Sequence, residues 1–141
     1  MQENQNKIQI QLDEGAIMPT RAHELDAGFD LYAKETARVY MHYTFDTGVH
    51  IQIPRGYAGI IKSRSGLNID RGLQCEGVVD AGYTGSIRVK LYNNRSTPYT
   101  VHEGDRIAQI LIVPVLTPEL VQVDKIAGGD RGSRGFGSSG K

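Results

Sequence analysis

Apolar and polar residues alternate in short runs along most of this chain, and glycine or proline separates the runs. The run at residues 7–12 places Ile8, Ile10 and Leu12 on one face, as a half-buried strand requires. The same kind of pattern predicts further strands at residues 47–53, 57–61, 87–92, 99–101 and 106–115. Many short strands with frequent turns between them favour an all-β barrel or sandwich.

A single short helix is predicted within this β-rich pattern. Residues 66–71 suit less than two helical turns, with Ser65 as the N-cap and Gly72 at the C-terminal end. After Val123 the composition changes, and residues 127–141 are rich in glycine and serine. We therefore expect a core domain at residues 1–126 and a flexible C-terminal arm at residues 127–141.

Composition and charge limit the function classes. The chain has 141 residues, which suits one domain, and its 16 basic residues balance 16 acidic ones, so general nucleic-acid binding is not indicated. We expect no signal peptide and no membrane span, because the start is polar and the apolar run at residues 110–116 is short. A cytoplasmic location is compatible with the single cysteine, Cys75, which we expect to be a small strand residue.

The four histidines are scattered and are expected to be solvated: His23, His42, His50 and His102. With one cysteine and no histidine cluster, a zinc site held by protein ligands alone is not expected.

Residues 77–85 form the first candidate site. Asp80 follows two valines, and Gly82, Tyr83 and Gly85 come directly after it. This order predicts a β-hairpin with a carboxylate and an aromatic ring at its corner, which suits a site that positions water against a flat-ringed ligand. The alternative is that Asp80 and the glycines serve only the turn.

Four more blocks accompany this one, at residues 26–33, 63–67, 104–110 and 131–140. In order and spacing, the five blocks resemble the motifs of trimeric deoxyuridine triphosphatases (dUTPases), from about Ile8 to Gly140. The resemblance implies a jelly-roll-like β fold, a homotrimer, and Mg²⁺-dependent hydrolysis of dUTP to dUMP and pyrophosphate. That reaction limits uracil incorporation into DNA and supplies dUMP for dTMP synthesis.

The resemblance also implies roles for particular residues around the base, the sugar and the metal. Asp80 would activate the water that attacks the α-phosphorus, and Tyr83 would pack on the deoxyribose and exclude a 2′-hydroxyl. Backbone groups at residues 73–77, including Gln74 and Gly77, would read the uracil edge. Asp30 would contact Mg²⁺ indirectly, through water; the alternative is that Asp30 serves a turn or an ion pair.

Other residues would bind the phosphates. Arg64, Ser65 and Gly66 offer a guanidinium, a hydroxyl and free amides at a helix start, although a capped helix with a surface arginine is the alternative. The resemblance implies that Gln109 also helps to hold the α-phosphate region of the nucleotide. In the block at residues 104–110 we expect Asp105 to cap the turn and Arg106 to pair with a carboxylate.

The arm would close the site. Phe136 would stack on the uracil, Arg131 and Ser138 would contact the γ-phosphate, and glycines such as Gly137 would let the backbone wrap the triphosphate. The partners implied are dUTP and further copies of the chain.

Three positions depart from the family pattern. Family members commonly have Asp at the position of Gly82, Gly at that of Arg134, and Asn at that of Gln74.

Two alternative functions stay open: a dCTP deaminase-like enzyme, and a non-catalytic nucleotide-binding or regulatory trimer. Deaminases carry a catalytic Glu where Lys90 stands, and the intact Asp80 argues against a non-catalytic protein.

Overall fold

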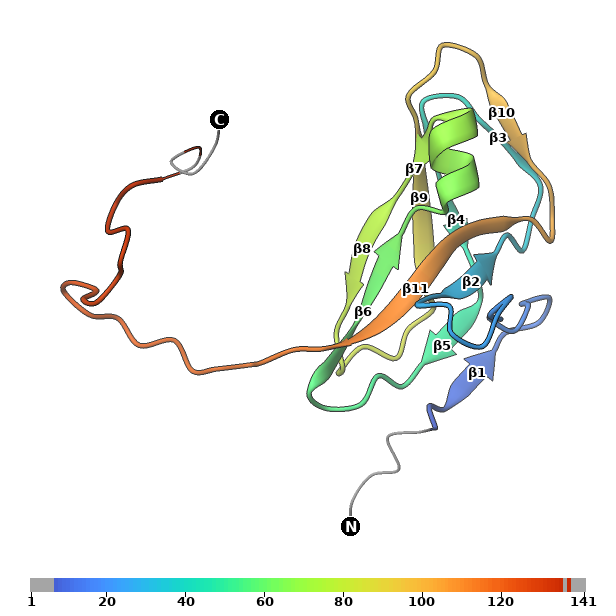
Figure 1. The fold of residues 1–141 in the computed structure, drawn as a ribbon. Coiled ribbons are helices and arrows are strands. Elements are labelled where there is room, and N and C mark those ends of the chain that lie inside the picture. The colour runs from blue at the N-terminus through green and yellow to red at the C-terminus, as the bar shows by residue number, and fades with distance from the viewer. Residues whose placement is uncertain (1–6, 136, 138–141) are drawn as a thin grey trace.

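The computed structural model describes residues 7–135 and 137, and its body is built almost entirely of short strands (Figure 1). In chain order, the elements are β1 (Ile10–Leu12), β2 (Phe29–Tyr32), β3 (Ala37–Val39), β4 (His42–Asp46), β5 (Val49–Ile51), β6 (Tyr57–Lys62), the helix η1 (Gly66–Asp70), β7 (Leu73–Gln74), β8 (Glu76–Val79), β9 (Arg88–Asn93), β10 (Tyr99–Val101) and β11 (Arg106–Pro114). The predicted all-β class with one short helix is confirmed.

Two larger sheets form the body. One has the strand order β2-β11-β6-β8 and the other the order β4-β9-β7; two smaller ribbons join β1 to β5 and β10 to β3. All of these pairs, within the part of the chain that the structure describes, are antiparallel. The long strand β11 crosses the body beside β2 and β6 (Figure 1).

The core lies between the two larger sheets, because alternate residues of each strand point inward. In β9, Val89 and Leu91 are buried while Arg88 and Lys90 are exposed. Val89 lies opposite Phe45, whose ring is fully buried. The first sheet contributes further apolar side chains to the same cluster, among them Leu31, Ile61, Ile107 and Ile110. This burial is the main stabilising contribution to a sandwich of two sheets.

The predicted strands at residues 57–61, 87–92, 99–101 and 106–115 correspond to β6, β9, β10 and β11. The alternation did not reveal β2, β3 and β4, which are three to five residues long. Leu12 was expected on a buried face but is 41% exposed. Its strand, β1, pairs with β5 in a two-stranded ribbon that is separate from the two larger sheets.

The predicted hairpin around Asp80 is wrong. Strand β8 pairs with β6, whereas β9 pairs with β4 and β7. Residues 80–87 therefore carry the chain from one sheet to the other; we call this segment the crossing loop. A turn nevertheless forms at its start, where the Tyr83 amide donates to the Asp80 carbonyl at 3.0 Å.

Cys75 marks an earlier change of sheet, between β7 and β8. Its amide donates to Ser63 Oγ at 2.9 Å, and the same hydroxyl donates to the Cys75 carbonyl at 3.2 Å. The Ser63 side chain thus takes the place of a strand partner at this interruption. Burial raises the pKa of the Cys75 thiol to about 11, so the thiol stays protonated at neutral pH, consistent with the structural role expected of it.

Ser65 does not cap the helix as predicted. Its backbone is already helical (φ −57°, ψ −42°) and its side chain makes no capping bond. The first helical bond instead runs from the Asn68 amide to the Arg64 carbonyl, at 2.9 Å. Ser65 is therefore already part of the first helical turn, so its side chain does not act as a cap. Gly72 ends it with φ +69°, as expected.

The last strand ends at Pro114, and the chain then leaves the body as an extended segment (Figure 1). This segment carries large apolar side chains in water, more than half exposed: Leu116, Leu120, Val121, Val123 and Ile126. The boundary at residue 126 between core and arm stays a prediction. None of the helices in the described part of the chain is long and apolar enough to span a membrane.

Candidate active site

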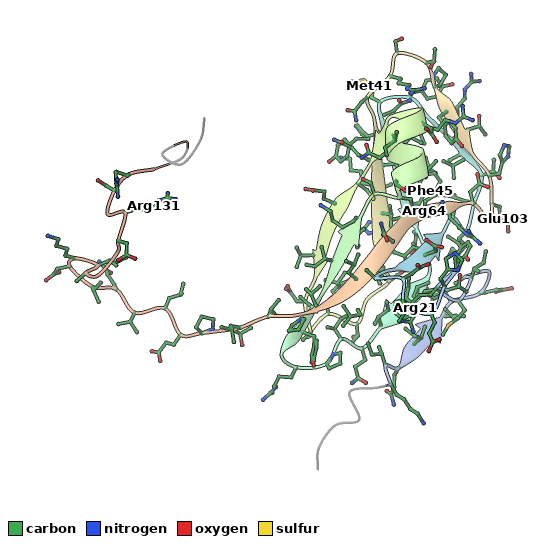
Figure 2. The ribbon with its side chains drawn as sticks, in the orientation of Figure 1. Arg21, Met41, Phe45, Arg64, Glu103 and Arg131 are labelled. Carbon is green, nitrogen blue, oxygen red and sulfur yellow. The ribbon has the colours of Figure 1, made fainter. Side chains whose placement is uncertain are left out.

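Asp30 lies at the centre of a charged cluster. Arg64 Nε donates to its Oδ1 at 3.1 Å, and Arg106 Nε lies 3.7 Å from its Oδ2. The Asp30 side chain is only 15% exposed, so the two guanidinium groups compensate a carboxylate that is largely removed from water. The expected pairing of Arg106 with a carboxylate is confirmed. Arg64 projects near the point where β11 crosses the body (Figure 2).

Gln109 lies directly opposite Asp30 in the β2–β11 pair. Its side-chain amide donates to the Ser63 carbonyl at 3.0 Å. Its Oε1 lies so close to Gly28 that a Cβ there would approach to 2.6 Å. Any side chain at residue 28 would therefore displace Gln109, which explains the need for glycine in the block at residues 26–33. The amide of Gln109 in turn fixes the segment that carries Arg64.

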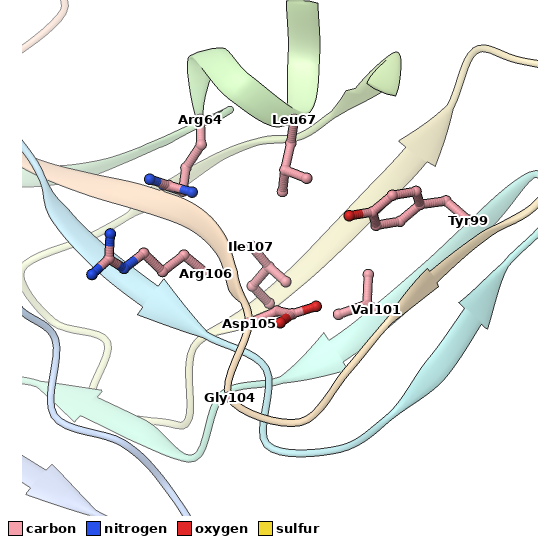
Figure 3. Close-up of a pocket in the computed structure, with 8 residues that line it drawn as sticks. All are labelled: Arg64, Leu67, Tyr99, Val101, Gly104, Asp105, Arg106 and Ile107. Atoms are coloured by element: carbon pink, nitrogen blue, oxygen red, sulfur yellow. The ribbon is translucent and has the colours of Figure 1, made fainter. Parts of the chain in front are cut away.

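A hollow of about 370 Å³ adjoins this cluster (Figure 3). It is lined by Arg64, Leu67, Tyr99, Val101, Gly104, Asp105, Arg106 and Ile107. The two guanidinium groups lie on one side of it, and the side chains of Leu67, Tyr99 and Val101 lie on the other (Figure 3). Asp105 caps its turn, as expected, by accepting from the His102 amide at 2.8 Å. The cationic side of the hollow is suited to an anionic group.

Asp80 and Tyr83 lie in a second place, on the crossing loop. Asp80 is exposed, and Tyr83 is 45% exposed with its hydroxyl donating to the Ser86 carbonyl at 2.8 Å. The Tyr83 ring lies against Gly85, where a Cβ would come within 2.6 Å of the hydroxyl oxygen. At Gly82 a Cβ would meet nothing within 4 Å, and φ is not in the left-handed region. The backbone here therefore does not require glycine.

One chain does not bring Asp80 and Arg64 together. In the β6–β8 register Val79 lies opposite Gly59 and Glu76 lies opposite Lys62. Asp80 follows the first pair and Arg64 follows the second, at opposite ends of the strand pair. With about 3.3 Å per strand residue, they are roughly 15–20 Å apart. Within a single chain, the candidate base and the candidate phosphate ligand belong to two separate clusters.

The other predicted site residues occupy further positions. Gln74 lies opposite Tyr92 in the β7–β9 pair, and Gly77 lies opposite Ile61 in the β6–β8 pair. Ser65 and Gly66 are exposed at the helix start.

The described part of the predicted arm lies apart from both clusters (Figure 1). Arg131 Nη2 donates to the Arg134 carbonyl at 3.1 Å in a local turn, and Gly137 has φ +86°. Phe136 and Ser138 lie outside the described residues.

The described residues contain no group of three or more His, Cys, Asp or Glu side chains arranged to hold a metal ion. Asp30 suits an indirect contact through water, because its oxygens already accept from Arg64 and face Arg106. Mg²⁺ keeps several waters and is often bound through substrate phosphates, so such a contact fits its chemistry.

One histidine was predicted wrongly. The His50 side chain is only 21% exposed and both ring nitrogens have partners, on the crossing loop and on the turn that follows β1. No sequence pattern predicts these two contacts of His50, because the partner residues lie 34 and 37 positions away along the chain.

A family model described as dUTPase matches residues 14–140, nearly the whole chain. The chain belongs to the dUTPase family. The deoxyuridine 5′-triphosphate nucleotidohydrolase of Leifsonia xyli subsp. xyli is 46% identical over 129 residues, covering 87% of this chain and 85% of the relative. That of Tropheryma whipplei is 42% identical over 136 residues, covering 92% and 93%.

Solved dUTPases share the fold. A mutant dUTPase of phage 80alpha superposes with a TM-score of 0.86 at 33% identity, covering 96% of this chain and 99% of the other. Another mutant of the Staphylococcus phage 80alpha enzyme, solved with dUpNHpp, has a TM-score of 0.86 at 32% identity. A mutant from phage phi11 of S. aureus, described with a structural Mg(II) ion, has a TM-score of 0.79 at 34% identity and covers 85% and 98%.

Proposed function

We propose that this member of the dUTPase family hydrolyses dUTP to dUMP and pyrophosphate, limiting uracil incorporation into DNA and supplying dUMP for dTMP synthesis. The observation that carries the proposal is the family match over residues 14–140, within which Asp80 is intact and exposed. The exposed Tyr83 ring beside it supports a nucleotide site at the crossing loop.

In this mechanism the Asp80 carboxylate orients a water molecule and accepts its proton. The oxygen attacks the α-phosphorus in line, and the bond to the bridging oxygen breaks as pyrophosphate leaves. Tyr83 holds the deoxyribose, and Arg64 and Gln109 hold the phosphates so that their positive and polar groups face the developing charge. Bound Mg²⁺ would add charge that offsets the phosphate oxygens, with Asp30 holding its waters.

The separation of the two clusters supports a site shared between subunits of a homotrimer. Asp80 and Tyr83 would come from one subunit, Arg64 and Ser65 from a second, and the arm from the third. The exposed apolar side chains after Pro114 support this assembly, because such a segment gains stability by packing on another chain. A hollow of about 650 Å³, lined mostly by apolar side chains including Ile8, Met18 and Phe29, offers the body a further apolar contact surface.

A nucleotide panel tests the activity and separates the alternatives. We expect release of pyrophosphate from dUTP with Mg²⁺, and at least about a hundredfold less from dCTP, because groups that hydrogen-bond the uracil edge are mismatched with cytosine. UTP and dTTP should also react much more slowly, because Tyr83 would exclude the 2′-hydroxyl group and a tight wall would exclude the C5 methyl group. Ammonia release from dCTP would favour a deaminase. Tight binding of dUTP without any turnover would favour a regulatory trimer.

Replacing Asp30 with asparagine tests the indirect metal contact. The change keeps the side-chain shape but removes the charge that orders metal-bound water, so we expect the Mg²⁺ requirement for turnover to rise about 10- to 100-fold. Asp26→Asn is the matched control, since Asp26 lies in the same block and is exposed, accepting only from the His23 amide. An unchanged Mg²⁺ requirement with a raised KM for dUTP would mean that Asp30 serves only to hold Arg64.

A further inference from the structure

His50, on β5, connects the crossing loop to the other side of the fold. Its Nδ1 lies 2.7 Å from the Thr84 carbonyl, and its Nε2 lies 3.0 Å from Asp13 Oδ1. A carbonyl and a carboxylate can only accept hydrogen bonds. A neutral imidazole has one N–H and can satisfy one of the two, whereas an imidazolium satisfies both.

We propose that protonated His50 is a positioning residue for the reaction: it ties the crossing loop, and with it Asp80 and Tyr83, to Asp13. When His50 loses its proton, one of its two bonds is lost and the loop is held less firmly. The inference rests on the proposed function, because it assumes that Asp80 and Tyr83 act on the nucleotide.

The remaining anchors of the loop do not depend on a histidine proton. Ser86 Oγ donates to Asp46 Oδ1, and the buried Thr47 hydroxyl donates to the Ile87 carbonyl at 2.6 Å. The Ile87 amide donates to the Val49 carbonyl at 2.9 Å. All of them hold the end of the loop nearest β9. Tyr83 also bonds within the loop, because its hydroxyl donates to the Ser86 carbonyl. Along the chain, His50 is the anchor next to Tyr83, through Thr84, so it acts on the part of the loop that is proposed to face the nucleotide.

The charges around His50 favour its protonated form. Asp13 contacts it directly, and Asp46, at the end of β4, adds a second negative charge. Hydrogen bonds from Ser86 and from the Gly48 amide lower the pKa of Asp46, and the cations Lys34 and Arg88 lower it further. The Thr84 carbonyl, followed by Asp13, raises the pKa of His50 above its ordinary value of about 6.5. The full tether is therefore present below that ordinary value and is lost as pH rises through the raised pKa.

His50→Gln tests the proposal, with His42→Gln as the matched control because His42 is an exposed histidine on β4, the strand that precedes β5 in the chain. Glutamine donates without titrating, but it cannot reach both acceptors as the ring does. We expect kcat/KM for dUTP to fall roughly 3- to 10-fold at pH 6. We expect wild-type kcat/KM to decline as pH rises through the pKa of His50, and this decline should disappear in His50→Gln and persist in His42→Gln. An unchanged rate and pH profile in His50→Gln would overturn the proposal.

A second measurement needs neither turnover nor a histidine variant. In an NMR titration of the ligand-free protein, the Thr84 and Gly85 amides should shift with the pKa of His50. The pKa of His50 should lie above the ordinary histidine value of about 6.5 and fall in Asp13→Asn, which removes the charge and keeps an acceptor. Loop amides that do not follow His50 would overturn the tether. If the wild type failed to hydrolyse dUTP, the proposed function would fail, and this titration would still decide whether His50 holds the loop.

Discussion

Asp80→Asn is expected to lower kcat for dUTP by about 10²- to 10⁴-fold, the usual loss when a positioned general base is removed. Asparagine has nearly the same shape but cannot accept the proton of the attacking water. The turn at Asp80 should survive, because it is made by the Asp80 carbonyl and the Tyr83 amide, both backbone groups. The measurement is pyrophosphate release, together with the melting temperature and calorimetric binding of dUpNHpp, which should both stay close to wild type.

Asp70→Asn is the control for Asp80→Asn, since Asp70 is also exposed but lies at the end of η1. It should leave kcat unchanged. Turnover near wild type in Asp80→Asn would assign Asp80 to the turn alone, and the proposed mechanism would be wrong.

The second large effect concerns the arm. A chain truncated after Ala127 is expected to be nearly inactive, like Asp80→Asn, because it lacks the residues predicted to close over the nucleotide. When the two variants are unfolded and refolded together in equal amounts, activity should return to about a quarter of the wild-type value. That fraction follows if Asp80 and the arm of each site come from different subunits drawn at random. The tethered arm acts at high effective concentration, so mixed sites should close normally.

Asp80→Asn refolded with itself is the control for this mixing experiment and should regain nothing. Verified mixed trimers without recovered activity would contradict a site shared between subunits. The enzymatic assignment would stand in that case, because it rests on the family match.

Local patterns in the sequence determined several strands, two turn features and the family of this protein. Alternation of apolar and polar residues predicts β9, β10 and β11, because every second side chain of a strand points toward the core. This alternation depends only on neighbouring residues along the chain. Turn chemistry likewise places the cap at Asp105 and the helix end at Gly72. The order of five blocks indicates the family, which the match over residues 14–140 bears out.

The tertiary structure alone decided which strands pair, and therefore where the functional groups lie. Residues 77–92 read as a hairpin in the sequence, but β8 finds its partner in β6 and β9 finds its partners in β4 and β7. This pairing puts Asp80 far from Arg64 within one chain and brings His50 to Thr84. The contact between His50 and Thr84 joins residues 34 positions apart. It depends on the sheet that each strand enters, and the local pattern of polar and apolar residues does not encode that choice.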